Sequence, residues 1–319
     1  MITEIRASAP GKIILSGEHF VVHGSYSVAA AINKRVYVSV REINGKDQIV
    51  SNDISSNLDS DDGSFPAVKS VTRNILSIAR NRKHSPFEIS ISSEIPSGSG
   101  LGSSAAVSVA CSAALSEFLG IPLNKEEISN LAFKGESTVH GNPSGLDIQA
   151  CQSGGLIVFK KSFETRSIHL KDPVRLLVVF SGRKRSTSKL IAKVADRRTE
   201  YPNQFQRLVD SASSGSFEMV DALKSRDLSK IGSLFTSLQV QLSWIGVSTP
   251  QLDDLIEFLY KKQEVLGAKL TGAGGGGSII AAIKSGSEDS VLKYVSSQYP
   301  YSFVTEIPQE GLRWEKATG

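Results

Sequence analysis

The chain has 319 residues, of which 40% are hydrophobic and 21% are charged, and this length and composition are typical of a globular protein with two domains. Its formal net charge of +4 suits an anionic substrate, but nucleic-acid binding would require a more basic surface studded with aromatic residues. No segment approaches the roughly 18 apolar residues of a membrane helix, and the N-terminus lacks a signal-peptide pattern, so we expect a cytoplasmic protein that binds neither membranes nor nucleic acids.

The first half of the sequence predicts mixed strands and helices. Five segments have the apolar spacing of a regular element: a strand–turn–strand over residues 2–40, a helix over 67–82, a strand over 87–91, a buried helix over 104–119 and a helix from 124 to about 139. The polar, aspartate-rich residues 51–63 predict a loop. Asn124 and Glu127 have the spacing of a capping box, in which two side chains bond the backbone at a helix start.

The second half predicts a strand over residues 174–180, followed by three helices and a strand. Thr249 and Pro250 are residue types that begin a helix. Because the sequence turns polar near residue 170, we expect one domain over residues 1–170 and a second over 171–319. Strands and helices alternate within each half, which favours an α/β or α+β class.

A glycine-rich turn stands between the strand over 87–91 and the buried helix. Glycine lets a backbone approach a ligand closely, and the first N–H groups of a helix have no partner inside it, so such a turn favours a phosphate. Two hydroxyls at its end could reach a phosphate or its metal ion. The alternative interpretation is an ordinary tight turn before a buried helix. The residues of the turn are Pro96, Ser97, Gly98, Ser99, Gly100, Leu101, Gly102, Ser103 and Ser104.

Two better-known glycine motifs do not fit this sequence. No Gly-Lys-Ser/Thr ends the turn, as a P-loop requires, and Ser103 stands where Gly-x-Gly-x-x-Gly needs its third glycine. Gly272, Gly274 and Gly277 do have that spacing, but the apolar run over 278–283 that follows them predicts a strand instead of a helix. A dinucleotide-dependent dehydrogenase is therefore disfavoured.

Two carboxylates, Glu136 and Asp147, bracket an irregular turn rich in Gly, Asn, Pro and Ser. One carboxylate could hold a magnesium ion, which prefers oxygen ligands, and the other could orient or deprotonate a hydroxyl nucleophile. The alternative is that Asp147 caps the next helix, which is the more common use of such a residue.

Two further segments carry unusual local chemistry. Lys12, Glu18 and His19 stand close together near the start of the chain, although a surface lysine and a solvated turn are the more common interpretation of such residues alone. Residues 272–277 contain five glycines in six positions. Because glycine costs backbone entropy, so many of them favour a close approach of the backbone to a ligand.

Taken together, and in this order along the chain, these segments resemble the GHMP kinase superfamily and, within it, the mevalonate kinase family. The resemblance spans residues 9 to about 283. Ser97 and Ser99 depart from the aliphatic residue and the alanine that are usual in the family, and both changes are small. The similar segments are residues 9–24, 96–106, 136–147 with His140 to Gly145, 269–277, and Arg185 to Thr187. We call residues 96–104 the ATP loop.

The resemblance implies a two-domain α+β GHMP kinase fold. Its N-terminal domain would be similar to domain 2 of ribosomal protein S5, and its C-terminal domain would be ferredoxin-like. The active site would lie in the cleft between them, and the last residues would return to the N-terminal domain. The implied reaction transfers the γ-phosphoryl group of ATP, with Mg²⁺, to the 5-hydroxyl of mevalonate in isoprenoid biosynthesis. Members of the family also lead us to expect a homodimer.

The resemblance also implies roles for individual residues. The ATP loop would cradle the phosphates, and Ser103 and Glu136 would hold Mg²⁺. Asp147 would accept the proton of the attacking hydroxyl, and Lys12 beside it would favour the ionised carboxylate and help to polarise the nucleophile. The residues implied at the substrate and the transferred phosphate are Glu18, His19, Ser144, Thr187, Gly272, Ala273 and Gly274.

Other functions remain alternatives at this point. A related GHMP kinase with another acceptor, such as phosphomevalonate kinase or mevalonate 3-kinase, shares most of these motifs. A catalytically inactive sensor or a nucleic-acid-binding protein could share the N-terminal fold, but the retained Lys12, Glu136 and Asp147 argue against an inactive protein.

Several other residues are given a structural interpretation. Cys111 and Cys151 have small, apolar neighbours, which predicts packed thiols in a reducing compartment. His19 and His23 lack the further ligands of a zinc site. The basic residues Lys189, Lys193 and Arg197 share one helix face, which favours a solvated surface over an anion-attracting rim at the active site.

Overall fold

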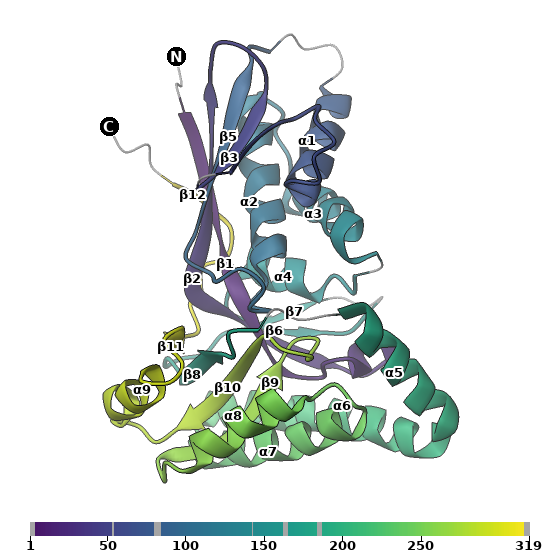
Figure 1. Ribbon diagram of the computed structural model, residues 1–319, viewed down its shortest axis with the longest axis vertical. Helices are drawn as coiled ribbons and strands as arrows, with labels where there is room; N and C mark the ends of the chain where they lie inside the picture. Colours follow the sequence, from purple (N-terminus) through teal and green to yellow (C-terminus); the bar gives the residue numbers. More distant parts are fainter. Residues whose placement is uncertain are drawn as a thin grey trace.

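The structure is a computed structural model. It describes residues 4–52, 54–79, 84–141, 143–161, 165–183 and 187–315, without the side chains of residues 140, 187–189 and 191. These residues form two β-sheets, each covered by helices (Figure 1). Within the described ranges, no helix has both the length and the apolarity to cross a membrane.

The first sheet is built around two long antiparallel strands, β1 (Glu4–Ser16) and β2 (Ser27–Glu42), which the 3-10 helix η1 (Phe20–His23) connects. Its strand order is β12-β1-β2-β5-β3-β4, and β6 pairs with β2 and with β7. Only the pairing of β3 with β5 is parallel. The remaining strands are β3 (Gln48–Ser51), β4 (Ile54–Asn57), β5 (Phe87–Ser93), β6 (Leu156–Phe159), β7 (Arg166–Ile168) and β12 (Arg313–Glu315).

Four helices lie together beside this sheet (Figure 1). They are α1 (Pro66–Ile78), α2 (Ser103–Phe118), α3 (Lys125–His140) and α4 (Leu146–Ser153). The α2 helix packs on β1 and β2 and is covered by α1 and α3, so it is buried along most of its length. Its many alanines and serines allow these neighbours to approach from every side. The predicted capping box is present, with Asn124 and Glu127 at the start of α3.

The second sheet has the strand order β11-β8-β10-β9, and all of its pairings are antiparallel. Its strands are β8 (Arg175–Phe180), β9 (Val265–Thr271), β10 (Ser278–Ile283) and β11 (Ser302–Glu306). Helices α7 and α8 pack on β9 and β10, and Figure 1 shows α6, α7 and α8 along the lower side of this sheet. The helices are α5 (Thr187–Glu200), α6 (Pro202–Ser225), α7 (Leu228–Trp244), α8 (Pro250–Tyr260) and α9 (Glu288–Ser296).

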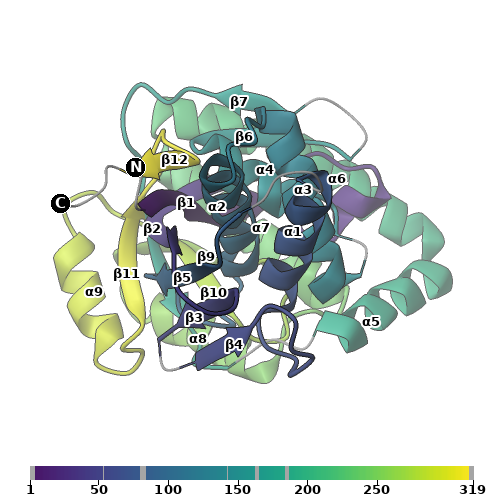
Figure 2. The same cartoon turned by 90° about the horizontal axis from the view of Figure 1, so that it is seen from above.

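The last described strand, β12, returns to the first sheet and pairs with β1 (Figure 2). The buried guanidinium of Arg35 on β2 donates to the carbonyl oxygen of Ser8 at 3.0 Å and to that of Gly311 at 2.6 Å. Hydrogen bonds from a buried charged group are among the stronger ones in proteins. The segment before β12 is therefore fixed to the first sheet.

Helix α7 and strand β9 touch backbone to backbone at two glycines. A methyl group at Gly267 would lie 1.9 Å from the carbonyl oxygen of Gly232, and one at Gly232 would lie 2.4 Å from that of Leu266. No side-chain rearrangement can relieve an overlap with backbone atoms. Strand β9 leads into the glycine-rich residues 272–277. Its position is therefore fixed by two glycines that have no side chain to keep the backbones apart.

Replacing Gly267 by alanine is expected to lower the free energy of unfolding by about 3 kcal/mol, because the helix and the strand must separate. Urea unfolding followed by circular dichroism measures the change. Gly215→Ala is the matched control, since a methyl group there meets nothing within 4 Å and alanine favours the helix. Equal midpoints for the two variants would contradict the packing argument.

The described residues contain four helices, α5 to α8, between β8 and β9, where the sequence predicted three. Two boundaries in the first half also differ from those predicted. Residues 51–63, predicted as a loop, include β4, which pairs with β3 at the edge of the first sheet. This edge strand is mostly exposed and is held by backbone hydrogen bonds to its one neighbour. Polar side chains are therefore tolerated, and the alternating apolar pattern that identifies a strand in a sequence is missing. The helix predicted over 67–82 is α1, which ends at Ile78; the residues 80–82 lie outside the described part of the chain.

Candidate active site

The ATP loop ends at the N-terminus of α2, where Gly102 is the residue before the helix. Gly102 has a φ of 78°, and no side chain caps the first N–H groups of α2. A methyl group at position 102 would also lie 2.8 Å from Cγ of Lys12. The buried helix thus begins with uncapped N–H donors beside a lysine, which favours an anion.

Lys12 joins β1 both to the ATP loop and to Asp147. Its backbone N–H donates to the carbonyl oxygen of Leu101 at 2.8 Å, and its Nζ donates to that of Gly100 at 3.3 Å. The same Nζ lies 3.1 Å from Oδ1 of Asp147. The Lys12 side chain is 1% exposed and that of Asp147 is 31% exposed. The ammonium is therefore shielded, while the carboxylate borders the solvent from which a hydroxyl can reach it.

Asp147 does not cap α4. The residue before this helix is Gly145, and Asp147 lies in the first turn, where the N-terminal end of the helix dipole favours a carboxylate. The structure brings together Lys12 and Asp147, which the sequence places at opposite ends of the N-terminal half. The capping alternative is not what the structure adopts.

Glu136 is buried near the end of α3 and faces the start of α2, where it accepts a hydrogen bond from the hydroxyl of Ser104. The sequence led us to expect that the preceding residue, Ser103, shares a magnesium ion with Glu136. The described residues contain no group of three His, Cys, Asp or Glu side chains that could hold a metal ion. One carboxylate and one hydroxyl beside a phosphate-binding turn nevertheless suit Mg²⁺, which commonly uses one or two protein oxygens together with phosphate and water.

Glu18 and His19 follow β1, and they contact different parts of the second domain. The buried Glu18 carboxylate accepts a hydrogen bond from Nζ of Lys269 on β9. Nε2 of His19 lies 2.9 Å from the carbonyl oxygen of Ala273, so this nitrogen carries the proton. Burial raises the pKa of Glu18 and lowers the pKa of Lys269, and their mutual attraction opposes both shifts. The carboxylate expected at the substrate is therefore occupied by Lys269.

The stability of the protein is expected to fall as the pH drops below about 6.5, the usual pKa of histidine. Burial lowers the pKa of His19, although its bond to Ala273 opposes the shift, so the unfolded chain takes up a proton before the folded one does. The stability contribution of neutral His19 is present above about pH 6.5 and is lost as the pH falls through its folded-state pKa. Urea unfolding of wild type and His19→Gln at pH 7.5 and 5.5 measures it. The variant should lose less stability than wild type, and equal losses would refute the assignment.

The glycines of residues 272–277 serve protein packing as well as any ligand. A methyl group at Gly274 would lie 2.3 Å from the carbonyl oxygen of Val247, and one at Gly277 would lie 3.0 Å from that of Ser99. The N–H of Gly275 donates to Val247 at 2.9 Å. The sequence interpretation attributed all of these glycines to a ligand, whereas backbone contacts with other segments explain several of them.

The residue that follows the glycine-rich stretch 272–277 also touches the ATP loop directly. The buried hydroxyl of Ser278, the first residue of β10, donates to the carbonyl oxygen of Ser99 at 2.9 Å. The two glycine-rich segments, each from a different sheet region, therefore meet at the site.

Not every predicted residue can be placed. Ser144 precedes α4, and its hydroxyl accepts a hydrogen bond from the N–H of Leu146 at 3.3 Å. Thr187 is the first residue of α5, but its side chain lies outside the described part of the structure, as do Arg185 and Ser186.

Sequence reasoning missed Lys269 and Thr271, which both bond to β1. A signal for Lys269 was available. It stands between Ala268 and Leu270 in a strand whose neighbours are apolar, and a lysine in a buried strand needs a partner for its charge.

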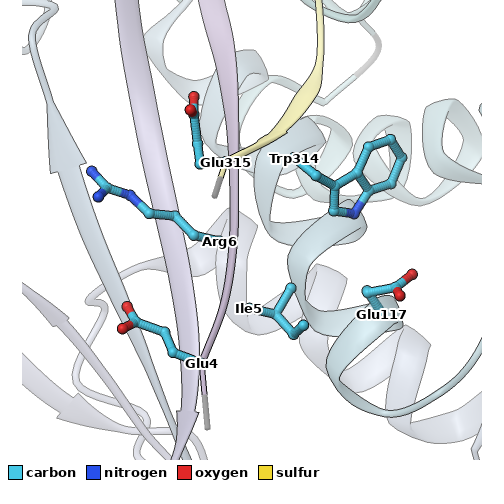
Figure 3. Close-up of a pocket in the computed structure, with 6 residues that line it drawn as sticks. All are labelled: Glu4, Ile5, Arg6, Glu117, Trp314 and Glu315. Carbon is cyan, nitrogen blue, oxygen red and sulfur yellow. The ribbon is translucent and has the colours of Figure 1, made fainter. Parts of the chain in front are cut away.

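Two surface cavities flank the first domain. One of about 390 Å³ lies between the start of β1, β12 and the end of α2, with Ile5, Glu117 and Trp314 in its lining (Figure 3). Glu117 is about 20 Å along α2 from Ser104 at the helical rise per residue, so this cavity is remote from Lys12. The other, about 370 Å³, is lined by residues of the segment 60–64 before α1, by residues of α1 and by Thr138 of α3.

Comparisons with known proteins agree with this geometry. The family model for the GHMP kinase N-terminal domain matches residues 67–155, and the model for the GHMP kinase C-terminal domain matches residues 219–300. The mevalonate kinase of Pyrococcus horikoshii is 34% identical over the whole of both chains. The chain belongs to the GHMP kinase family. The predictions of an ATP-dependent kinase and of the GHMP kinase fold are thereby confirmed.

Other GHMP kinases give the same picture. The mevalonate kinase of Archaeoglobus fulgidus is 37% identical, with 97% of this chain and 99% of that protein aligned. The crystal structure of L. major mevalonate kinase in complex with R-mevalonate superposes with a TM-score of 0.81 at 28% identity, covering 95% of this chain and 96% of that one. The likeness therefore extends through both domains of this GHMP kinase.

Proposed function

We propose that this GHMP kinase is a mevalonate kinase, which transfers the γ-phosphoryl group of ATP to the 5-hydroxyl of mevalonate and yields 5-phosphomevalonate for isoprenoid biosynthesis. The observation that carries the proposal is the ion pair between Lys12 and Asp147, 3.1 Å apart, beside the ATP loop. The names of the curated relatives and the R-mevalonate bound to the L. major enzyme support the choice of acceptor.

The ATP phosphates are assigned to the start of α2. The uncapped N–H groups after Gly102 and the positive end of the helix dipole favour the negative charge there. Phosphoryl transfer depends mainly on positioning and on neutralising charge, which fixed backbone donors provide without reorganisation.

Magnesium is assigned to Glu136 and the serine hydroxyls at the start of α2. The contact between Ser104 and Glu136 favours Ser104 as the neighbouring ligand, beside the Ser103 expected from the sequence. When bound, the ion neutralises phosphate charge. Glu136 and the serine supply its oxygen ligands from two different helices, and so fix where the phosphates must lie.

The proton of the mevalonate 5-hydroxyl is assigned to Asp147. Its carboxylate is partly exposed and is held by the buried Lys12, so it is oriented while one side stays accessible. Lys12 fixes the position of the Asp147 carboxylate, 3.1 Å from its Nζ, and is placed to polarise the attacking oxygen, which is the arrangement that general-base assistance requires.

The rest of mevalonate is assigned to the surface between the two domains. His19 and the backbone of residues 272–274 come from opposite domains and meet through the contact of His19 with Ala273. Ser144 and Thr187 are the further candidates from the sequence.

We also propose that the two domains divide near residue 170, between β7 and β8. The described strands before this point all belong to the first sheet, and those after it form the second sheet, except for β12, which belongs to the first. The last residues return to the N-terminal domain through β12.

Replacing Glu136 by glutamine is expected to raise the magnesium concentration needed for half-maximal activity by about tenfold or more, because one anionic ligand is lost. Activity measured against free Mg²⁺ at saturating ATP tests this. Glu127→Gln is the control, since that residue caps the far end of the same helix. An unchanged magnesium curve for Glu136→Gln would remove the ligand assignment.

The proposed function is tested by coupled detection of ADP with a panel of acceptors. Mevalonate-dependent ADP release, with the phosphate on the 5-oxygen in phosphorus NMR, is the expected result. Faster turnover with 5-phosphomevalonate, or transfer to the 3-hydroxyl, would favour phosphomevalonate kinase or mevalonate 3-kinase. No acceptor-dependent ADP release would leave an inactive member of the family.

A further inference from the structure

Lys269 is a buried lysine whose ammonium has all its hydrogen bonds satisfied. Its side chain is 0% exposed and that of its ion-pair partner Glu18 is 1% exposed. Besides Glu18, Nζ donates to the carbonyl oxygens of Ile14 at 3.2 Å and of Leu270 at 2.7 Å. An ammonium has three N–H donors, so none is left for a ligand. Burying such an ion pair is unfavourable unless all of its hydrogen bonds are made. The pair is therefore stable only with the segments that carry Ile14, Glu18 and Lys269 in this one relative position.

Thr271, two residues further along β9, holds the same point of β1. Its hydroxyl oxygen accepts a hydrogen bond from the N–H of Ile14 at 2.8 Å and lies 3.2 Å from the Ile14 carbonyl oxygen. Residues two apart in a strand face the same side. Lys269 and Thr271 therefore fasten β9 of the second sheet to β1 of the first, just before the turn that carries His19.

His19 has a backbone conformation that it does not hold unaided. Its φ is 59° and its ψ is −42°, in a region that is unfavourable for residues other than glycine and persists only where the surroundings fix it. Two side-chain contacts fix this turn: the Glu18 carboxylate bonds to Lys269, and the His19 imidazole bonds to the carbonyl oxygen of Ala273. Both partners belong to the segment 269–273.

We propose that Lys269 is a positioning residue for the mevalonate site: through Glu18 it holds the turn of residues 17–19, so that His19 faces the substrate. Lys269 and Glu18 touch no substrate in this arrangement, because both are buried and paired. The inference rests on the proposed function, and it assigns Glu18 to the support of His19 instead of to mevalonate itself.

Lys269→Met tests the proposal, because methionine keeps the length and removes the charge. We expect the KM for mevalonate to rise about 10- to 100-fold, as a small misplacement of a substrate-binding group does. The KM for ATP should stay within about twofold, a change too small to indicate lost binding energy, since the hydrogen bonds of Lys269 go to Ile14, Glu18 and Leu270, which lie outside the ATP loop. Lys230→Met removes an exposed pair with Glu218 and should leave both constants unchanged. Equal rises in both KM values, or no rise for mevalonate, would overturn the proposal.

A second variant separates positioning from folding. Lys269→Met leaves the Glu18 carboxylate buried without its partner, which destabilises the fold, whereas Glu18→Gln/Lys269→Met removes both charges. We expect the double variant to regain most of the urea midpoint lost by the single one and to keep the raised KM for mevalonate. Recovery of the KM together with the midpoint would show that the pair serves stability alone.

A double-mutant cycle tests whether Lys269 acts through His19. If it does, Lys269→Met should add little to the KM effect of His19→Ala. Multiplication of the two effects would overturn the proposed route. The wild-type assay distinguishes failure of the proposed function from failure of this inference. Absence of mevalonate-dependent turnover in the wild type would refute the proposed function. An active wild type, together with an unchanged KM for mevalonate in Lys269→Met, would refute only this inference.

Discussion

Asp147→Asn is expected to lower kcat by about 10²–10⁴-fold, the usual contribution of a general base. Asparagine has the same shape and can still accept a hydrogen bond from Lys12, so the fold should remain. It cannot take the proton of the 5-hydroxyl. The KM for mevalonate should change little, because the loss falls on the transition state instead of on binding.

Steady-state kinetics and calorimetric titration with a non-hydrolysable ATP analogue together check this expectation. Nucleotide affinity should be close to that of wild type, since Asp147 lies in α4 and the phosphates are assigned to α2. Asp253→Asn, a change on the first turn of α8, is the matched control and should retain full activity. Turnover near the wild-type rate in Asp147→Asn would remove this residue from the mechanism.

Lys12→Met is expected to lower kcat by about 10²–10³-fold, the range observed when a preorganised transition-state donor is removed. The variant loses the ammonium that orients Asp147 and holds the carbonyl of Gly100 in the ATP loop. The effect should therefore appear in the KM for ATP as well as in kcat, unlike that of Asp147→Asn.

Lys12→Arg should not rescue activity. The Lys12 side chain is 1% exposed, and its stem packs against Gly102, where even a methyl group would come within 2.8 Å. A guanidinium needs more room than this site has. Activity of Lys12→Arg near the wild-type level would mean that any cation suffices and that the position of the ammonium does not matter.

Much of the fold could be predicted from local patterns, and the failures have physical reasons. The capping box at Asn124 and the apolar surface of α2 are local features, so the sequence predicted both elements within a residue or two. The edge strand β4 was missed because its polar residues need only a backbone partner. The meeting of α7 with β9 depends on Gly232 and Gly267 being opposite each other, which no local pattern encodes.

The candidate site was predictable only in part. The sequence motifs indicated Lys12 and Asp147 as site residues but gave no distance between them. In the structure, Nζ of Lys12 lies 3.1 Å from Oδ1 of Asp147. Glu18 was expected at the substrate because it is a charged residue in a recognisable motif. Its partner Lys269 is 251 residues away in the sequence. The apolar neighbours of Lys269 indicated that it needs a partner, but spacing along the chain could not show that the partner is Glu18. The Glu18–Lys269 pair thus depends on a contact between distant segments that no local pattern encodes.

The pairing of β12 with β1 places the first and last described strands side by side, with Arg6 opposite Glu315. A short engineered linker could thus join residues 4 and 315, and the chain could be opened in an exposed loop such as that around Gly286. A permuted enzyme of this kind would keep every contact of the catalytic cleft. An affinity tag fused directly after residue 315, in contrast, needs a spacer, because β12 is the strand that covers the edge of the first sheet.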